Sequence, residues 1–237
     1  MNLAIDSATL KRLVGIRAMG ESQIRPVGLE ADRLGRPTPP DHDFFQLLLK
    51  VGLGRSRWAG EEVSSSKPEP GAQASSPSVG NSRGMLCIAE EMSYWDRGVA
   101  VSFPGPGLGE PPLLSMGTED QKRRFLGPFL EPDRPRWGSF AMTEPSAGSD
   151  VAAIATTARK DGSDWILNGD KSFAANASRA DWILVWATVD ASLGRGGHRA
   201  FIIERDTPGL GDFVIEKKMG LKGYESTSFT MRDCRVS

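Results

Sequence analysis

The stretch "AMTEPSAGSD", residues 141–150, decides how this chain is interpreted. Pro145 fixes its own φ, Gly148 permits a positive φ, and the Ser149 and Asp150 side chains can hydrogen-bond to nearby backbone. Such a composition suits a connecting loop. It equally suits a binding loop whose backbone N–H groups and hydroxyls face a ligand with phosphates or polar ring edges. The flanking sequence has to decide between the two.

The sequence before this stretch has helical periodicity. Thr118 and Gln121 form an S/T-x-x-E/Q capping box and predict a helix start there. Apolar spacing predicts further helices at residues 6–19, 43–54 and 85–96, the second capped by Asp41 or Asp43. Residues 28–43 are rich in Pro, Gly and charge and predict an exposed loop. Residues 61–84 have almost no large apolar side chains, so we expect a mobile loop or linker.

The sequence after residue 137 has the short period of β-strands. Seven β-prone runs follow one another, at residues 140–143, 151–158, 165–167, 182–188, 200–203, 213–216 and 227–231. Asn168-Gly169 is the commonest type I′ signal and predicts a hairpin. The pattern predicts a small β-sandwich or barrel at residues 137–237, after a helical domain at residues 1–136. The expected fold class is therefore α+β.

Composition narrows the possible functions. With 29 Lys and Arg against 30 Asp and Glu, no global field favours nucleic acid or an anionic membrane. Cys87 and Cys234 lie far apart and lack metal-ligand spacing, which indicates reduced thiols and no metal site. No segment reaches the roughly 20 apolar residues of a membrane span. We expect a cytoplasmic protein.

Four blocks, in order along the chain, resemble the acyl-CoA dehydrogenase family. They are "MGTEDQKRRFLGPFL" (116–130), "AMTEPSAGSDVAAIATTA" (141–158), "WILNGDKSFAANASRADWILV" (165–185) and "KKMGLKGYESTSFTMRDCRV" (217–236). The resemblance implies an N-terminal all-α domain followed by a middle β-barrel domain. It also implies an FAD-dependent oxidoreductase of lipid metabolism that converts an acyl-CoA thioester to the trans-2-enoyl-CoA.

The resemblance assigns residues 141–149 to the flavin site. It implies that Phe140, Met142 and Thr143 contact the FAD ring, with Thr143 and the Met142 backbone bonded to its pyrimidine end. Gly148 and Ser149 are expected where the flavin and the acyl-CoA thioester arm approach, so Ser149 is also a substrate-binding candidate. Fixed donors at the pyrimidine end stabilise the negative charge of a reduced flavin.

A second flavin segment is implied at residues 173–176. Phe173 provides an aromatic wall, but Ala175 lacks the hydroxyl that relatives place near the reactive edge of the flavin. One lost hydrogen bond costs about 1 kcal/mol if water replaces it. The departure leaves a second interpretation open, a non-catalytic acyl-CoA- and flavin-binding or scaffold protein derived from the family.

The resemblance places the catalytic base on a C-terminal helical bundle that this sequence does not include. We therefore predict a truncated or split chain that forms a homo- or hetero-oligomer, with a partner supplying the base. The catalytic residue is unknown. Glu144 is interpreted as a structural or capping carboxylate, and nothing favours an oxidase or monooxygenase relative.

Overall fold

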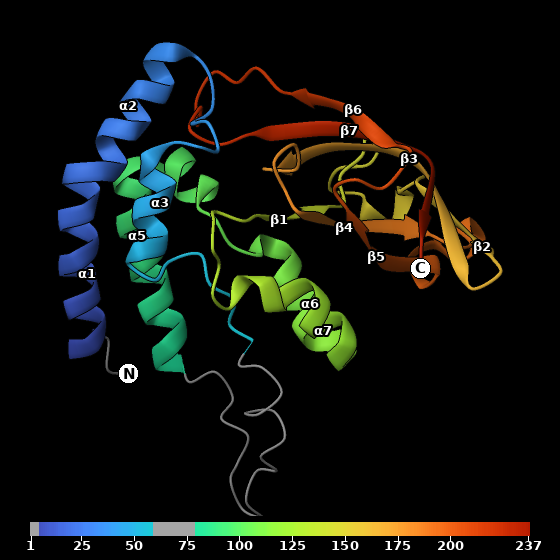
Figure 1. Cartoon of the computed structure of the whole chain (residues 1–237), viewed down its shortest axis with the longest axis horizontal. Coiled ribbons are helices and arrows are strands. Elements are labelled where there is room, and N and C mark those ends of the chain that lie inside the picture. The colour runs from blue at the N-terminus through green and yellow to red at the C-terminus, as the bar shows by residue number, and fades with distance from the viewer. Residues whose placement is uncertain (1–4, 59–78) are drawn as a thin grey trace, which may run out of the picture. The chain divides into compact units, whose positions relative to one another are not determined.

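The computed structural model describes residues 5–58 and 79–237, and the chain divides into two compact units (Figure 1). The first, here called the helical unit, consists of residues 5–39, 79–102 and 218–224. Residues 40–58, 103–217 and 225–237 form the second, the sheet unit. The sheet unit therefore contains helices from before residue 137 as well as the strands.

The helical unit is built on two helices that lie side by side, α1 (Ser7–Met19) and α5 (Val79–Ser102) (Figure 1). Asp6 caps α1, because its carboxylate accepts the Thr9 N–H at 2.8 Å. A π-helical turn (Gly20–Ile24) joins α1 to α2 (Arg25–Leu34). A Cβ on Gly20 would lie 2.2 Å from the Trp95 ring, so this glycine permits the close approach of the helices.

Helix α5 consists of two helical segments separated at Asp96. Asp96 has φ −168° and ψ 113°, and its carboxylate accepts the Val99 N–H at 2.8 Å. Asp96 thus caps the second segment in the way an N-cap does. Of the predicted linker at residues 61–84, residues 61–78 lie outside the described residues, and residues 79–84 form the first turns of α5.

Two helical predictions need correction. The predicted loop at residues 28–43 is partly helical, because α2 continues to Leu34 and ends at Gly35 with a φ of 65°. Helix α3 (Asp43–Lys50) is capped by His42, whose side chain accepts the Phe44 N–H at 3.1 Å, and not by Asp41 or Asp43. The imidazole nitrogen serves as an acceptor here, a role that the usual cap residues normally fill.

Seven strands form one curled sheet (Figure 1). They are β1 (Gly138–Ala141), β2 (Thr157–Asp161), β3 (Asp164–Ala175), β4 (Trp182–Thr188), β5 (His198–Glu204), β6 (Leu210–Ile215) and β7 (Ser226–Val236). The order is β1-β4-β2-β3-β7-β6, and β5 pairs with β4. Strand β4 runs parallel to β1 and β2, and the other pairs are antiparallel. The predicted α+β class is confirmed.

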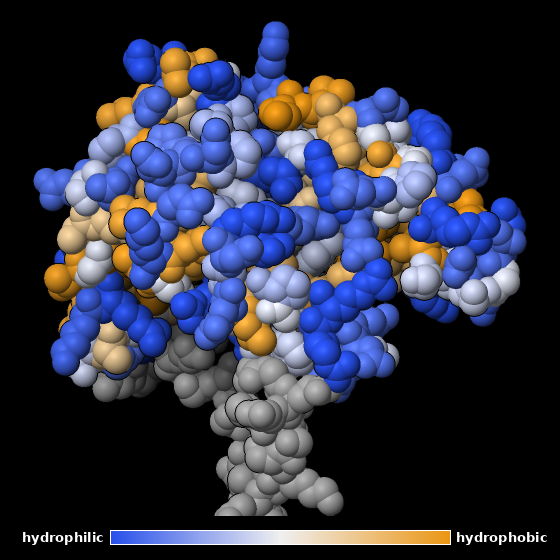
Figure 2. Space-filling view, viewed as in Figure 1, coloured by the Kyte–Doolittle hydropathy of each residue, from blue (hydrophilic) through white to orange (hydrophobic). Residues whose placement is uncertain are grey.

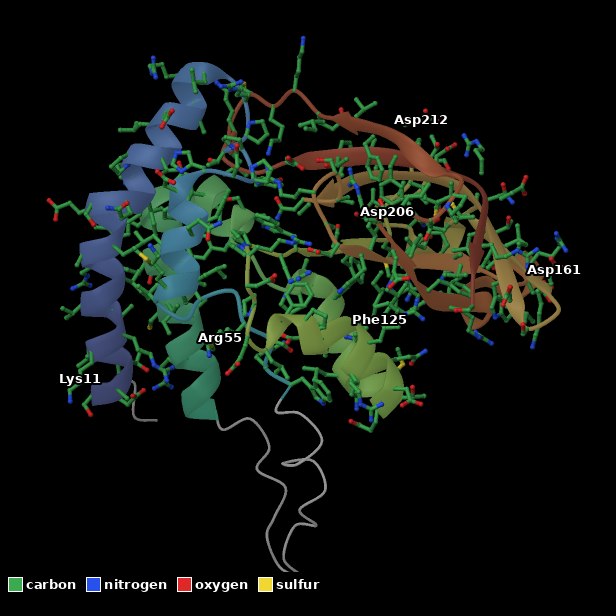
Figure 3. The ribbon with its side chains drawn as sticks, in the orientation of Figure 1. Lys11, Arg55, Phe125, Asp161, Asp206 and Asp212 are labelled. Atoms are coloured by element: carbon green, nitrogen blue, oxygen red, sulfur yellow. The ribbon has the colours of Figure 1, made fainter. Side chains whose placement is uncertain are left out.

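Helices α6 (Glu110–Met116) and α7 (Glu119–Leu126) of the sheet unit pack against the strands. The capping box is confirmed, since Thr118 and Gln121 exchange side chain to backbone bonds of 3.2 and 2.9 Å. Phe125, labelled on α7 in Figure 3, lies in an apolar cluster with Trp58, Leu113, Leu126, Phe129, Trp182 and Leu184. The Trp182 indole N–H donates to the Phe125 carbonyl at 2.9 Å and ties strand to helix.

The predicted hairpin at Asn168-Gly169 is wrong. Both residues lie inside β3, where the pairing with β7 shifts between Leu167 and Gly169. The turn is instead at residues 162–163, next to Asp161, which Figure 3 labels. Gly169, with φ 152°, is required because a Cβ there would lie 2.5 Å from Thr156 Oγ1. The glycine permits a close approach of two segments.

The other β-prone runs shift at their edges. Residues 151–153 form a 3₁₀ turn rather than a strand, and β2 begins at Thr157.

On the face shown in Figure 2, hydrophilic residues dominate and hydrophobic ones occur in small groups. Among the helices in the described ranges, none combines the length and the apolar character that crossing a membrane requires.

Candidate functional site

The site candidates lie on two neighbouring segments of the sheet unit, one running from β1 to residue 143 and the other the end of β3. The Ser139 hydroxyl donates to the Ala175 carbonyl at 2.8 Å. The Ser172 N–H donates to the Thr143 carbonyl, also at 2.8 Å. These two bonds bring together Phe140, Met142, Thr143, Phe173 and Ala175.

Phe173 has an unusual backbone and an exposed ring. Its φ is 59°, in the left-handed region, and it stands where the register between β3 and β7 shifts. For a residue other than glycine this conformation costs on the order of 1–2 kcal/mol. The side chain is nevertheless 66% exposed, so burial does not offset that cost. An exposed aromatic side chain in a strained backbone is typical of a ligand contact.

Thr143 has free hydrogen-bonding groups. Its carbonyl is bonded to Ser172, but neither its N–H nor its hydroxyl has a partner among the residues that the structure describes. The residue is only partly buried. A ligand that reaches Thr143 can therefore use two donors that the protein does not use itself.

Residues 144–147 form a tight turn. The Glu144 N–H donates to the Ala147 carbonyl at 2.9 Å, and the Ala147 N–H donates back at 3.1 Å. Gly148 and Ser149 follow on an exposed stretch, and a Cβ on Gly148 would meet nothing within 4 Å. In the described chain neither of them hydrogen-bonds to the five residues brought together above.

A buried ion pair lies beneath this turn. The Glu144 carboxylate accepts three hydrogen bonds, from Lys171 Nζ at 2.7 Å, Ala155 N–H at 2.6 Å and Thr156 N–H at 3.0 Å. The Lys171 and Glu144 side chains are 0% and 4% exposed. Lys171 Nζ also donates to the Met142 carbonyl at 3.1 Å. The interpretation of Glu144 as a structural carboxylate is confirmed by these contacts.

Burial and pairing act in opposite directions on these two groups. Burial raises the pKa of Glu144, but the hydrogen bonds from Lys171, Thr156 and Ala155 together hold its pKa below the ordinary value of 4.5. Burial lowers the pKa of Lys171, and the hydrogen bond and charge of Glu144 partly offset this. The Glu144 carboxylate is therefore ionised at neutral pH, and the group that it faces is the Lys171 ammonium.

Two candidates pack mainly against protein. Phe140 is partly buried against the apolar cluster of α6, α7 and β4. Met142 is partly buried, and its carbonyl is held by Lys171. In a ligand site, Phe140 would therefore contribute part of the wall, and Met142 would contribute its backbone.

Sequence reasoning did not identify Lys171. The residue stands in "NGDKSF", directly after the predicted hairpin at Asn168-Gly169, where a lysine is ordinarily a solvated charge. Its partner Glu144 lies 27 residues earlier. The available signal was an acidic residue in block 141–158 and a basic residue in block 165–185. Both blocks also contain other charged residues, and nothing in the spacing paired these two. Within residues 5–58 and 79–237 no cluster of acidic, His or Cys side chains could hold a metal ion.

The fold and the site define a class of protein. Residues 139–234 match the model of the acyl-CoA dehydrogenase middle domain, which places the sheet and both candidate segments in that domain. The structure is similar to that of butyryl-CoA dehydrogenase from Megasphaera elsdenii, with a TM-score of 0.80 and 30% identity. That similarity covers 100% of this chain and 58% of the other.

Curated relatives agree with this class. A 3-(aryl)acrylate reductase from Clostridium sporogenes is 37% identical over 222 residues, 93% of this chain and 54% of the relative. A short-chain specific acyl-CoA dehydrogenase from Megasphaera elsdenii is 32% identical over 219 residues, 92% and 53% respectively. The chain belongs to the acyl-CoA dehydrogenase family. It spans about half the length of these two relatives.

Proposed function

We propose that the sheet unit binds FAD between residues 141–149 and 173–175, and that the protein oxidises an acyl-CoA thioester to the trans-2-enoyl-CoA. The observation that carries the proposal is the bond from the Ser172 N–H to the Thr143 carbonyl. It holds the segment with exposed Phe173 against Thr143, whose N–H and hydroxyl have no partner in the described chain. An aromatic face suits stacking on a flavin ring, and two fixed donors suit the polar edge of its pyrimidine.

The residues present fit a flavin in these respects. Phe173 would cover the ring, and Thr143 would donate to its pyrimidine end together with the Met142 backbone. Bound FAD would supply the hydride acceptor of the reaction. Fixed donors near the pyrimidine stabilise the negative charge that develops there, and they are in place before the reaction begins. Phe140 would form part of the wall.

The substrate class is the second part of the proposal. We propose that an acyl-CoA thioester approaches near Gly148 and Ser149, which are exposed and have open space beside them. Loss of the proton α to the thioester carbonyl requires a base and donors that stabilise the enolate. Four points stay predictions from the resemblance: the base, its source, the partner chain and the oligomeric state.

We propose the cytoplasm as the location of the protein, and the two free cysteines, Cys87 and Cys234, support this proposal.

Ala175 favours a second candidate function. A methyl group stands where relatives are expected to carry a hydroxyl, and this is compatible with a protein that binds flavin and acyl-CoA without oxidising it. The two candidates differ in one observable property. Only the enzyme transfers electrons from the thioester to the flavin.

The test is the visible absorption spectrum of the purified protein with added FAD, before and after acyl-CoA thioesters of several chain lengths. We expect a bound flavin spectrum, and we expect it to bleach with at least one thioester when the protein is purified together with the partner that supplies the base. A bound flavin that no thioester bleaches even in that complex would favour the non-catalytic candidate. A protein that takes up no FAD would overturn the proposal.

A further inference from the structure

We infer that the buried Lys171–Glu144 pair is a positioning device for the flavin-facing backbone, and that Lys171 fixes the direction of the Thr143 N–H. The inference rests on the proposed FAD site for its functional consequence. Its structural part stands on the contacts of the pair alone, so the two can be tested separately.

The peptide group between Met142 and Thr143 is held in one orientation by Lys171. Lys171 Nζ donates to the Met142 carbonyl at 3.1 Å. A trans peptide group points its C=O and its N–H in opposite directions, and the described chain contains no cis peptide. The bond from Lys171 therefore turns the Thr143 N–H away from the ammonium, where no described residue accepts it.

The next peptide group along the chain, between Thr143 and Glu144, is held at both ends. The Thr143 carbonyl accepts the Ser172 N–H, and the N–H of the same peptide group, on Glu144, donates to Ala147. Two successive peptide planes are thus held by β3, one through a side chain and one through the backbone. Only the first of them leaves its N–H unused.

Lys171 is itself held by Glu144. Lys171 is fully buried, so its ammonium is retained only because Glu144 accepts from it at 2.7 Å. Glu144 in turn accepts the N–H groups of Ala155 and Thr156. The pair thereby joins three stretches of chain: the end of β1 with its turn, residues 155–156, and β3. A charged pair with this many fixed partners has little freedom to move.

Lys171 and Glu144 are therefore positioning residues, and neither is placed in contact with a ligand. A role limited to stability would let all protected amides of the sheet unit exchange faster by the same factor. A positioning role affects the amides of the clamp selectively. These are the N–H groups of Glu144, Ala147, Ala155, Thr156 and Ser172.

The experiment compares the whole protein with its Lys171→Met and Glu144→Gln variants by amide hydrogen exchange and FAD titration. Glu110→Gln is the matched control, because Glu110 is also buried and accepts three hydrogen bonds, from Ser56 and Arg57, away from the clamp. Glu144→Gln keeps the side-chain volume and serves as the second variant if Lys171→Met does not fold.

We expect exchange at the five clamp amides to be faster in both clamp variants than in wild type. This acceleration should be at least about tenfold larger than the acceleration at amides of the β4–β5 pair. We also expect a roughly tenfold weaker FAD affinity, with a shifted flavin absorption band, and neither change in Glu110→Gln. Uniform acceleration of exchange overturns the positioning role. Selective acceleration with unchanged FAD affinity and spectrum overturns its link to the flavin. A wild type that binds no FAD overturns the proposed function, while the exchange data still decide the clamp.

Discussion

Glu110 and Glu144 are both buried carboxylates of the sheet unit, and each accepts three hydrogen bonds, but their cations differ in exposure. Glu110 pairs with Arg57 at 2.7 Å, and the Arg57 side chain is 67% exposed. Glu144 pairs with Lys171, whose side chain is fully buried. Arg57 can return to water if its partner is removed, and Lys171 cannot. Equal numbers of hydrogen bonds to a carboxylate therefore do not imply equal dependence on the charge of its partner.

The two carboxylates also join different parts of the unit. Glu110 begins α6 and holds Ser56 and Arg57, next to Trp58 in the apolar cluster. That cluster buries large side chains and does not depend on one ion pair. Glu144 holds a turn whose neighbours Pro145 and Ser146 are exposed. The Ala147 methyl group is the one apolar side chain that this turn buries, so the ion pair carries more of its order.

Lys171→Met is the substitution with the largest expected effect on the free energy of unfolding. Removing the ammonium leaves an ionised, buried Glu144 with two N–H donors and no cation, so we expect the free energy of unfolding to fall by about 3–5 kcal/mol. Chemical denaturation measures the change. The double variant Lys171→Met/Glu144→Gln is expected to recover part of the loss. A loss below about 1 kcal/mol in the single variant would mean that water or protonation relieves the charge easily.

Features of this molecule that are determined by residues close together in the sequence could be predicted, and features determined by contacts between distant residues could not. The capping box at Thr118 and the strand period after residue 137 are local patterns, and both predictions hold. Asn168-Gly169 is equally local, but the structure uses Gly169 for a close approach to Thr156 and bonds Asn168 to Asp233. Tertiary contacts override the hairpin preference there.

The candidate site divides in the same way. The resemblance supplies Phe140, Met142, Thr143, Phe173 and Ala175, and the structure brings these five together through two cross-links between segments. The positive φ of Phe173 was not predictable, because it arises from the bulge between β3 and β7. Lys171 was not predictable either, since its burial and its partner are consequences of the fold.

The second prediction compares the losses in the free energy of unfolding caused by Glu144→Gln and by Glu110→Gln. The glutamine amide replaces one carboxylate oxygen with a donor in each case, but only at residue 144 does the change leave a buried cation unpaired. We expect losses of about 3 kcal/mol for Glu144→Gln and about 1–2 kcal/mol for Glu110→Gln. The two unfolding curves under identical conditions measure the difference. Equal losses would contradict the claim that the exposure of the cation decides the cost.

Acidification provides a third, smaller effect on the Glu144 side of the comparison. The folded pKa of Glu144 lies below its ordinary value of 4.5, so the unfolded chain takes up the proton first as the pH falls. The stability that Glu144 contributes is complete above pH 4.5 and is lost as the pH falls through the folded pKa. Denaturation of wild type and Glu144→Gln from pH 7 to pH 3 should show a gap that narrows only below pH 4.5. A gap independent of pH would mean that the carboxylate is not ionised in the native state.

Arg57→Ala is expected to have the smallest effect. The guanidinium is 67% exposed, and Glu110 keeps its bonds from the Ser56 hydroxyl and the Arg57 N–H after the side chain is removed. Water can reach the carboxylate from the side that the arginine leaves, so we expect a loss of about 0.5–1 kcal/mol, reduced further by added salt. Denaturation at low and high ionic strength measures both. A loss as large as that of Lys171→Met would show that Arg57 stabilises Glu110 as a buried partner does, and the contrast between the two carboxylates would then have to arise from their hydrogen bonds alone.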